Sequence, residues 1–345
     1  MKKILLTLIT IFVCFAAIAQ ESEKKGFFLF RNYDKITYDS TYIGRPVGTK
    51  WTIKLRTMSL IQNFTTKGEY EGIAFNSKLS TGLKPKLNVQ VGYKGVAFGG
   101  GISLRKLKGI KDGDFDIKLN MYGKKFGFEL SLSGIESLHG TYTFNIPGWS
   151  EIPLIYDNDT IYIPLPIELD VPEGKVSQAV FNFNFYYAVN NKKFSYPAAF
   201  TQMFIQKKSA GSLLLGGELH VNVLNIGDTV NGDELFRLRN VTYGLGVGYG
   251  YNLVLFKKML IHVSALPYIV LHSRTVVNNY MQEDYTVTSD FPEVFISGRG
   301  ALVYNFSSKW FAGATCQLNW SNVNNNKLKT TNSQWQIFAF LGIRL

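Results

Sequence analysis

The sequence predicts an all-β fold, a transmembrane antiparallel β-barrel that follows a cleaved signal peptide, and three observations lead to this class. The chain opens with a short basic and apolar leader, its later segments alternate apolar and polar residues, and the apolar rows carry almost no charge. Successive side chains of a strand point to opposite faces. A row facing lipid and a row facing a polar interior therefore produce this alternation.

Composition excludes several other classes. Of the 345 residues, 46% are hydrophobic and 18% are charged, which is too apolar for a disordered chain. Lysine and arginine exceed aspartate and glutamate by 37 − 25 = 12, an excess that suggests nucleic acid in a soluble protein. We expect no nucleic-acid partner, because the basic residues are interleaved with apolar rows instead of being gathered in one groove.

The first element is the leader, residues 1–19. Lys2 and Lys3 are followed by an apolar stretch, and Ala17-Ile18-Ala19 forms a small-x-small cleavage site. This pattern is typical of a secretory signal peptide, so we predict export by the Sec route and a mature net charge of 12 − 2 = +10. A retained anchor and a lipoprotein acylated at Cys14 are the less favoured alternatives. After cleavage only Cys316 remains, which leaves no intrachain disulfide.

Residues 20–50 are predicted to form an N-terminal periplasmic segment, and residues 51–345 the barrel. Thirteen candidate strands begin near residues 51, 84, 96, 114, 125, 178, 195, 211, 240, 259, 292, 309 and 333. Since such barrels have an even number of strands, we predict twelve, with fourteen as the alternative if 70–80 or 137–147 adds one. Many runs exceed the five or six residues usual in soluble sheets, roughly nine to eleven being needed to cross a membrane.

Connections are predicted to alternate between tight turns and longer loops. The turns include 94–95 and 257–258, and the loops are 64–83, 147–177, 224–238 and 273–289. Long loops on one rim are expected to face the outside of the cell. Aromatic residues near the ends of the runs suit the two membrane interfaces; they are Trp51, Tyr93, Tyr122, Trp310, Trp320 and Trp335.

The segment 240–255 shows the alternation most clearly. One row is apolar from Val241 to Leu255, and the other holds Gly244, Gly246, Gly248 and Gly250. A glycine-rich nucleotide loop is disfavoured, because the spacing is strictly two and no helix pattern follows. We interpret the glycines as a smooth interior wall that leaves room for bulkier side chains opposite.

A segment of the chain carries a resemblance to a known family. It runs from Lys193-Phe194-Ser195-Tyr196-Pro197 into Gln206-Lys207-Lys208-Ser209. With these residues the chain resembles an uncharacterised family of Bacteroidetes outer-membrane proteins, described as a domain of unknown function, over roughly residues 30–345. The resemblance implies a barrel without an assigned activity and adds no catalytic residue. The motif residues it marks are Phe194, Ser195, Tyr196, Gln206, Lys207, Lys208, Ser209, Ala210, Gly211 and Ser212.

Charged residues and histidines on the polar rows are the candidates for facing the lumen. They are Lys54, Arg56, Lys118, Glu129, Glu218, His220, His262, Arg299 and Arg344. Opposed charges across a barrel of about twelve strands favour a plugged or narrow lumen. An open, anion-preferring pore is the alternative.

No local signature of catalysis is present, neither Gly-x-Ser-x-Gly nor His-Glu-x-x-His. We therefore predict no catalytic residue, no cofactor and no metal site. His220, His262 and nearby serines keep open a second alternative, a membrane lipid-modifying enzyme, which would need a nucleophile and a base that converge in space.

The acidic segment 147–177 stands apart, with five prolines and a single lysine, Lys175. Its acids are Glu151, Asp157, Asp159, Glu168, Asp170 and Glu173. They suit divalent cations that bridge lipopolysaccharide, although a solvated loop without a specific ligand is favoured.

The sequence thus predicts an integral outer-membrane barrel, porin-like in form, non-enzymatic, with a structural or surface-interaction role. The alternatives are a diffusion or ligand-selective pore and a lipid-modifying enzyme. The expected partners are outer-membrane lipids and lipopolysaccharide, with the outer-membrane assembly machinery and periplasmic chaperones acting during export.

Overall fold

The structure is a computed structural model that describes residues 37–46, 48–70, 72–107, 113–156, 159–227, 234–279, 282–288, 293–324 and 328–345. The predicted signal peptide, the first part of the predicted segment 20–50 and Asp157 lie outside these residues. In the part described, no helix is long and apolar enough to cross a membrane.

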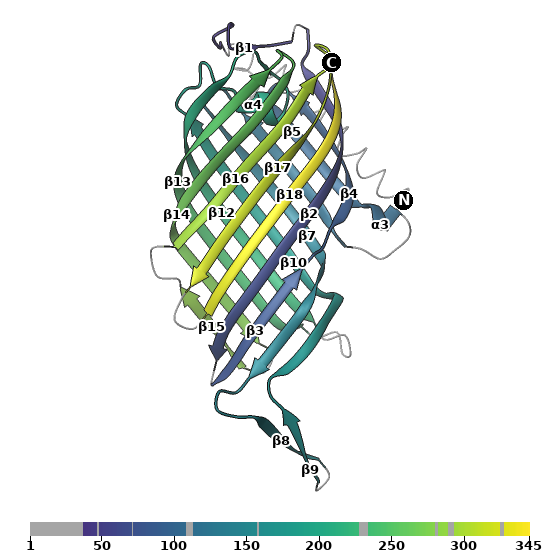
Figure 1. Ribbon diagram of the computed structural model, residues 1–345, viewed down its shortest axis with the longest axis vertical. Helices are drawn as coiled ribbons and strands as arrows, with labels where there is room; N and C mark the ends of the chain where they lie inside the picture. Colours follow the sequence, from purple (N-terminus) through teal and green to yellow (C-terminus); the bar gives the residue numbers. More distant parts are fainter. Residues whose placement is uncertain are drawn as a thin grey trace.

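A single large antiparallel sheet closes on itself as a barrel (Figure 1). Closure comes from the pairing of the last strand with the first long one, with Ile337 opposite Ser59. The strands of the ring are β2 (Trp51–Tyr70), β4 (Lys84–Tyr93), β5 (Val96–Ser103), β6 (Phe115–Tyr122), β7 (Phe126–Asn145), β10 (Ile167–Ala188), β12 (Ala210–Gly227), β13 (Glu234–Leu255), β14 (Met259–Asn279), β16 (Glu293–Asn305), β17 (Trp310–Asn324) and β18 (Leu328–Arg344).

The predicted twelve strands are confirmed. The sheet has fourteen strands in the described residues, and two of them, β3 (Ile73–Ser80) and β15 (Gln282–Thr288), are additions to the ring. β15 pairs only with β14, whereas β3 lies between the distal half of β2 and β7. The run 70–80 is therefore a strand, as the fourteen-strand alternative required, but the ring stays at twelve.

The two ends of the barrel differ in their connections. At the end that carries the C-terminus, here called the turn end, the strands are joined by residues 94–95, 123–125, 189–209, 256–258 and 306–309. The opposite end is the loop end. There a hairpin of β8 (Glu151–Tyr156) and β9 (Asp159–Pro164) projects beyond the barrel (Figure 1).

Several predicted loops are wrong in extent, because the strands continue into them. β10 begins at Ile167 and not near 178, and 147–177 also contains the β8–β9 hairpin. The loop 64–83 contains the end of β2 and all of β3. Prolines and charged residues do not end these strands, because the extended parts of the strands lie beyond the apolar outer band, where their side chains face water.

The outer surface carries the predicted apolar row. Leu245, Val247 and Leu341 are 60%, 55% and 51% exposed. The glycines of β13 point inward, and a Cβ on Gly250 would lie 3.1 Å from Cζ of the Phe194 ring. A Cβ on Gly248 would lie only 2.0 Å from the Ala265 carbonyl oxygen. The glycine row therefore allows the neighbouring strand, and a segment inside the barrel, to approach the backbone of β13 closely.

The predicted strand near 195 is wrong. Residues 196–200 form the short helix α4 (Tyr196–Phe200), for which Ser195 is the N-cap: its Oγ accepts a hydrogen bond from the Ala198 amide at 3.2 Å. Pro197 in the first turn favours the same conformation. Alternating Phe194, Tyr196 and Ala198 imitate a strand, but this cap and proline begin a helix.

Candidate functional site: the closed interior

Residues 190–209 of the connection between β10 and β12 enter the turn end of the barrel and are here called the plug. Phe194 and Ala199 are fully buried, and Phe204 is 2% exposed. These side chains pack against inward-facing residues of several strands, among them Leu214, Tyr268, Val303 and Phe311. The resemblance motif from Phe194 to Ser209 thus lies in the plug, whereas its last three residues, Ala210, Gly211 and Ser212, begin β12 of the barrel wall.

The N-terminal segment covers the plug from outside. β1 (Ile43–Gly44) pairs with β11 (Ile205–Gln206) of the plug, with Ile43 opposite Gln206. Tyr38 meets the Phe204 ring edge-on at 5.0 Å between centroids. The plug is therefore held between the described part of the N-terminal segment and the barrel wall.

Two cations of the wall hold the C-terminal end of α4. Lys54 Nζ donates to the Phe200 carbonyl at 2.7 Å and to Gln202 Oε1 at 2.5 Å. Arg344 Nε donates to the Gln202 carbonyl at 2.5 Å. The last carbonyls of a helix lack partners within the helix and attract positive charge. Lys54 and Arg344 therefore face inward and serve as anchors for the plug.

A second anchor contains the histidine His262, its neighbour Ser264 and Asn252, of which the sequence did not single out Asn252. Its ring bonds to Asn252 Oδ1 at 2.7 Å and to Ser264 Oγ at 3.0 Å, and Ser264 Oγ lies 3.0 Å from the Tyr196 hydroxyl. Asn252 Nδ2 donates to the Ser195 carbonyl at 3.0 Å. The order serine, histidine, asparagine matches the order of nucleophile, base and orienting group.

Burial argues for an anchor and against a nucleophile. His262 and Asn252 are 0% exposed and Ser264 is 3% exposed. The His262 ring lies against Phe194, Tyr196 and Phe200, with centroids 5.1–5.9 Å apart. The hydroxyl that would attack a substrate is bonded to the plug, so the group as observed joins the plug to β13 and β14.

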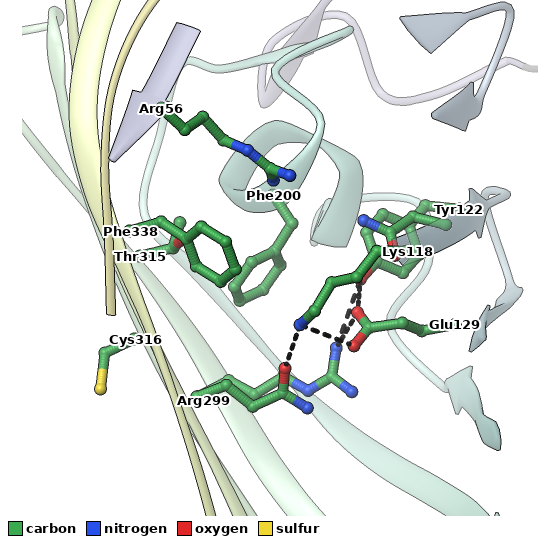
Figure 2. A pocket seen from close by; sticks show the side chains of 11 residues that line it. Arg56, Lys118, Tyr122, Glu129, Phe200, Arg299, Thr315, Cys316 and Phe338 are labelled. Carbon is green, nitrogen blue, oxygen red and sulfur yellow. Dashed lines mark hydrogen bonds and ion pairs between the residues drawn. The ribbon is translucent and has the colours of Figure 1, made fainter. Parts of the chain in front are cut away.

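Beyond the plug lies a charged layer that Figure 2 shows around a small cavity. Glu129 Oε2 accepts from the Tyr122 hydroxyl at 2.7 Å and lies 3.3 Å from Arg299 Nη1, while Glu129 Oε1 lies 3.6 Å from Lys118 Nζ. Lys118 also donates to Gln317 Oε1 at 3.1 Å. One carboxylate thus joins cations from β6 and β16 across the interior.

The cavity is too small for a drug-sized ligand. It leaves about 40 Å³ for the centres of water molecules, and Phe200 of the plug and Phe338 of β18 line it together with the charges. A drug-sized ligand needs roughly 300 Å³ or more. Arg56 closes one side of the cavity: Nε donates to Asn88 Oδ1 at 2.7 Å and the guanidinium lies 4.6 Å from the Phe338 centroid.

Glu218 and His220 lie on β12 and face the same interior. His220 is bonded to Asn182 of the neighbouring strand. Glu218 is 7% exposed, and its carboxylate has no hydrogen-bond partner among the described residues. It lies opposite Asn184 on β10. The polar layer therefore extends across β10 and β12, but these two residues do not join the Glu129 network through any contact observed.

Toward the loop end an apolar cluster that the sequence did not predict occupies much of the interior, beside buried polar side chains such as Gln62, Lys86 and Asp114. The side chains of this cluster are Met58, Leu60, Phe64, Leu79, Ile135, Leu138, Val176, Val180, Leu224, Leu238 and Phe338. The sequence of β2 contains a signal for these apolar side chains. Its inward row changes from Lys54 and Arg56 to Met58 and Leu60, while its outward row changes from apolar Leu55 to polar Asn63 and Lys67. The inward row thus gains apolar side chains past Arg56, although Gln62 and Thr66 on it are polar, and the outward row becomes polar beyond Ile61.

The acidic residues of 147–177 do not converge. Glu151 lies on β8, whereas Glu168, Asp170 and Glu173 follow one another along β10. Glu173 lies 2.6 Å from Lys84 and pairs with Arg105. Among the described residues, no three histidine, cysteine, aspartate or glutamate side chains come together as a metal site.

The closed ring, its apolar outer band and its filled interior define a transmembrane β-barrel of the outer-membrane type. A family model described as "Domain of unknown function (DUF4421)" matches residues 37–344. The chain belongs to this family.

Solved outer-membrane barrels are similar in fold. The outer membrane protease OmpT of Escherichia coli is 7% identical, with a TM-score of 0.41 over 87% of this chain and 98% of that one. The β domain of the Bordetella autotransporter BrkA is 9% identical, with a TM-score of 0.33 over 86% and 100%. The toluene transporter TodX of Pseudomonas putida is 8% identical, with a TM-score of 0.30 over 89% and 94%. A comparison with curated proteins gave no match.

Proposed function

We propose that this protein is an integral outer-membrane barrel that is closed to solutes, has no catalytic activity and acts through its loop end at the cell surface. The observation that carries the proposal is closure at two separate levels. The plug fills the turn end, and the apolar side chains around Leu60 and Leu138 fill the interior toward the loop end. Open diffusion would need both to be displaced.

The predicted export leader and the lipid-facing rows support the outer membrane as the location. In such barrels the short turns face the periplasm and the long loops face outward. The turn end would then be periplasmic, and the predicted N-terminal periplasmic segment would lie beside it. On this proposal the Sec route delivers the chain, and periplasmic chaperones and the assembly machinery insert it.

The loop end supports a role in surface contacts. The β8–β9 hairpin projects beyond the barrel (Figure 1), and Ile161 and Tyr162 on it are 54% and 58% exposed. Trp149, just before β8, is 56% exposed. Large exposed apolar side chains in a projecting element are typical of contact surfaces. Outer-membrane lipids and lipopolysaccharide are the partners we favour for this surface.

Conductance in planar bilayers tests the closure. We expect no current steps from the refolded wild-type chain under conditions in which a general diffusion porin conducts. A variant in which 194–204 is replaced by a short Gly-Ser linker should also stay silent, because the apolar layer still closes the barrel. Heat-dependent gel mobility checks that this variant has folded. Reproducible current steps from the wild type would favour the pore alternative and overturn the proposal.

Labelling with a fluorophosphonate tests the absence of catalysis. We expect Ser264 to remain unlabelled in the folded barrel, because its hydroxyl is bonded to Tyr196 and buried. Ser264→Ala is the matched control, since it removes only the hydroxyl. Labelling of the wild type that disappears in Ser264→Ala would establish a reactive serine and support the lipid-modifying alternative.

A further inference from the structure

The turn end carries an excess of lysine. Each of its five described connections contains at least one, and so does the segment that leads into β2. These lysines are Lys50, Lys94, Lys124, Lys125, Lys192, Lys193, Lys207, Lys208, Lys257, Lys258 and Lys309. Asp39 is the only acidic side chain in these connections and in the described residues 37–50, and it accepts hydrogen bonds from the Thr41 amide and hydroxyl at 3.0 and 2.6 Å.

The loop end has no comparable excess of positive charge, because acidic and basic side chains are mixed there. Glu173, for instance, pairs with both Lys84 and Arg105. The positive charge of the chain is therefore concentrated on one rim. Such a concentration attracts a negatively charged surface within about a Debye length, roughly 8–10 Å at physiological salt.

Five of these lysines form a group on the outer rim, here called the rim lysines: Lys124, Lys125, Lys257, Lys258 and Lys309. They belong to the β6–β7, β13–β14 and β16–β17 turns, so they are spread around the circumference. Of these five, Lys124 lies over the Tyr38 ring, 5.7 Å from its centroid, and several lysines of the plug are engaged as well. Lys207 Nζ donates to the Ser40 carbonyl at 3.0 Å, and Lys193 and Lys208 lie over the Tyr42 ring.

An exposed aromatic side chain adjoins the rim lysines in each of the three turns. Phe126 follows Lys125 and is 56% exposed, and Phe256 precedes Lys257 and is 88% exposed. Lys309 is followed by Trp310, which is 48% exposed. Exposed aromatic rings at the ends of strands lie at the level of lipid headgroups. An acidic soluble protein would explain the lysines but not the rings.

From this pairing we infer that the rim lysines bind the headgroups of anionic phospholipids in the leaflet that surrounds the turn end. The ring of each turn lies at the boundary of the acyl chains, and the neighbouring ammonium groups reach the phosphates just beyond it. Long lysine side chains extend in this way along an apolar surface. The inference rests on the proposed membrane location, which would make this leaflet the periplasmic one.

Fluorescence quenching in reconstituted vesicles tests the inference. The full chain is refolded into phosphatidylcholine vesicles containing either brominated phosphatidylglycerol or brominated phosphatidylcholine, and quenching of tryptophan, including Trp310 beside Lys309, is compared. We expect the wild type to prefer the anionic lipid by about fivefold, the factor that corresponds to one lysine near an anionic surface. High salt should reduce the preference.

The variant Lys124→Gln, Lys125→Gln, Lys257→Gln, Lys258→Gln, Lys309→Gln should show no preference. Its matched control is Lys67→Gln, Lys78→Gln, Lys329→Gln, in which exposed lysines of the loop end are changed, and this control should keep the wild-type preference. A preference that survives in the rim variant, or equal quenching by both lipids in the wild type, would overturn the inference while leaving the barrel in the membrane. Absence of quenching by either lipid would instead contradict the proposed function.

Discussion

Glu129→Gln is expected to destabilise the barrel by about 3–5 kcal/mol, the usual cost of removing one partner from a buried ion pair. Glu129 is 4% exposed and lies between Lys118 Nζ at 3.6 Å and Arg299 Nη1 at 3.3 Å. Glutamine keeps the shape but leaves both cations without their carboxylate inside the barrel. The measurement is urea-induced unfolding of the refolded protein in detergent micelles, followed by tryptophan fluorescence.

Glu136→Gln provides the matched control for this substitution. Glu136 lies on the same strand, β7, but its side chain is exposed, so its replacement should change the free energy of unfolding by no more than about 0.5 kcal/mol. In the double variant Lys118→Gln, Glu129→Gln the loss should be smaller than the sum of the single losses, because the two residues interact. Equal effects of Glu129→Gln and Glu136→Gln would show that the network does not stabilise the barrel.

Tyr196→Ala is expected to cost about 3–5 kcal/mol, as for other large aromatic side chains removed from a core. The Tyr196 ring is 3% exposed and stacks on Tyr186 with centroids 4.5 Å apart. Its hydroxyl also ends the hydrogen-bonded chain through Ser264 and His262. Unfolding in urea gives the free energy, and hydrogen exchange of 193–207 shows whether the plug loosens before the strands do.

Tyr196→Phe separates packing from hydrogen bonding. The ring remains and only the bond to Ser264 is lost, so we expect a cost of about 1 kcal/mol. Exchange in 193–207 should rise far more in Tyr196→Ala than in Tyr196→Phe, with β13 and β14 little changed. If both variants exchanged at the wild-type rate throughout the plug, Tyr196 would not be one of its anchors.

Much of the fold could be predicted from the sequence, because a strand in a membrane barrel obeys local rules. The row from Val241 to Leu255 faces lipid and the glycine row faces inward, so a period of two is enough to define β13. The same rule produced one strand too many. Residues 194–200 alternate like a strand, and only the cap formed by Ser195 with Pro197 distinguishes the start of α4.

The interior was harder to predict, since its contacts join residues far apart in the chain. Lys54 could be expected to face inward, but its partner Gln202 is recognised only once the plug lies inside the barrel. Asn252 carried no local pattern for the same reason, whereas Ser264 is one of the serines near His262 that the lipid-modifying alternative included. The apolar layer at the loop end was missed because one polar interior was assumed along the whole length of β2. The inward row of β2 changes from charged to apolar between Arg56 and Met58, which contradicts that assumption.

The position of β3 has a consequence for the order in which the barrel can assemble. β4, β5 and β6 are short and end part of the way along the length of the barrel. Beyond their ends, toward the loop end, β3 alone lies between β2 and β7. The circumference thus decreases by two strands, and the diameter with it. The pairing of β3 with β7 can form only after β4, β5 and β6 have paired in order and brought β7 close to β2. We therefore expect the pairing of β3 with β7 to form late, after the other strands have inserted into the bilayer.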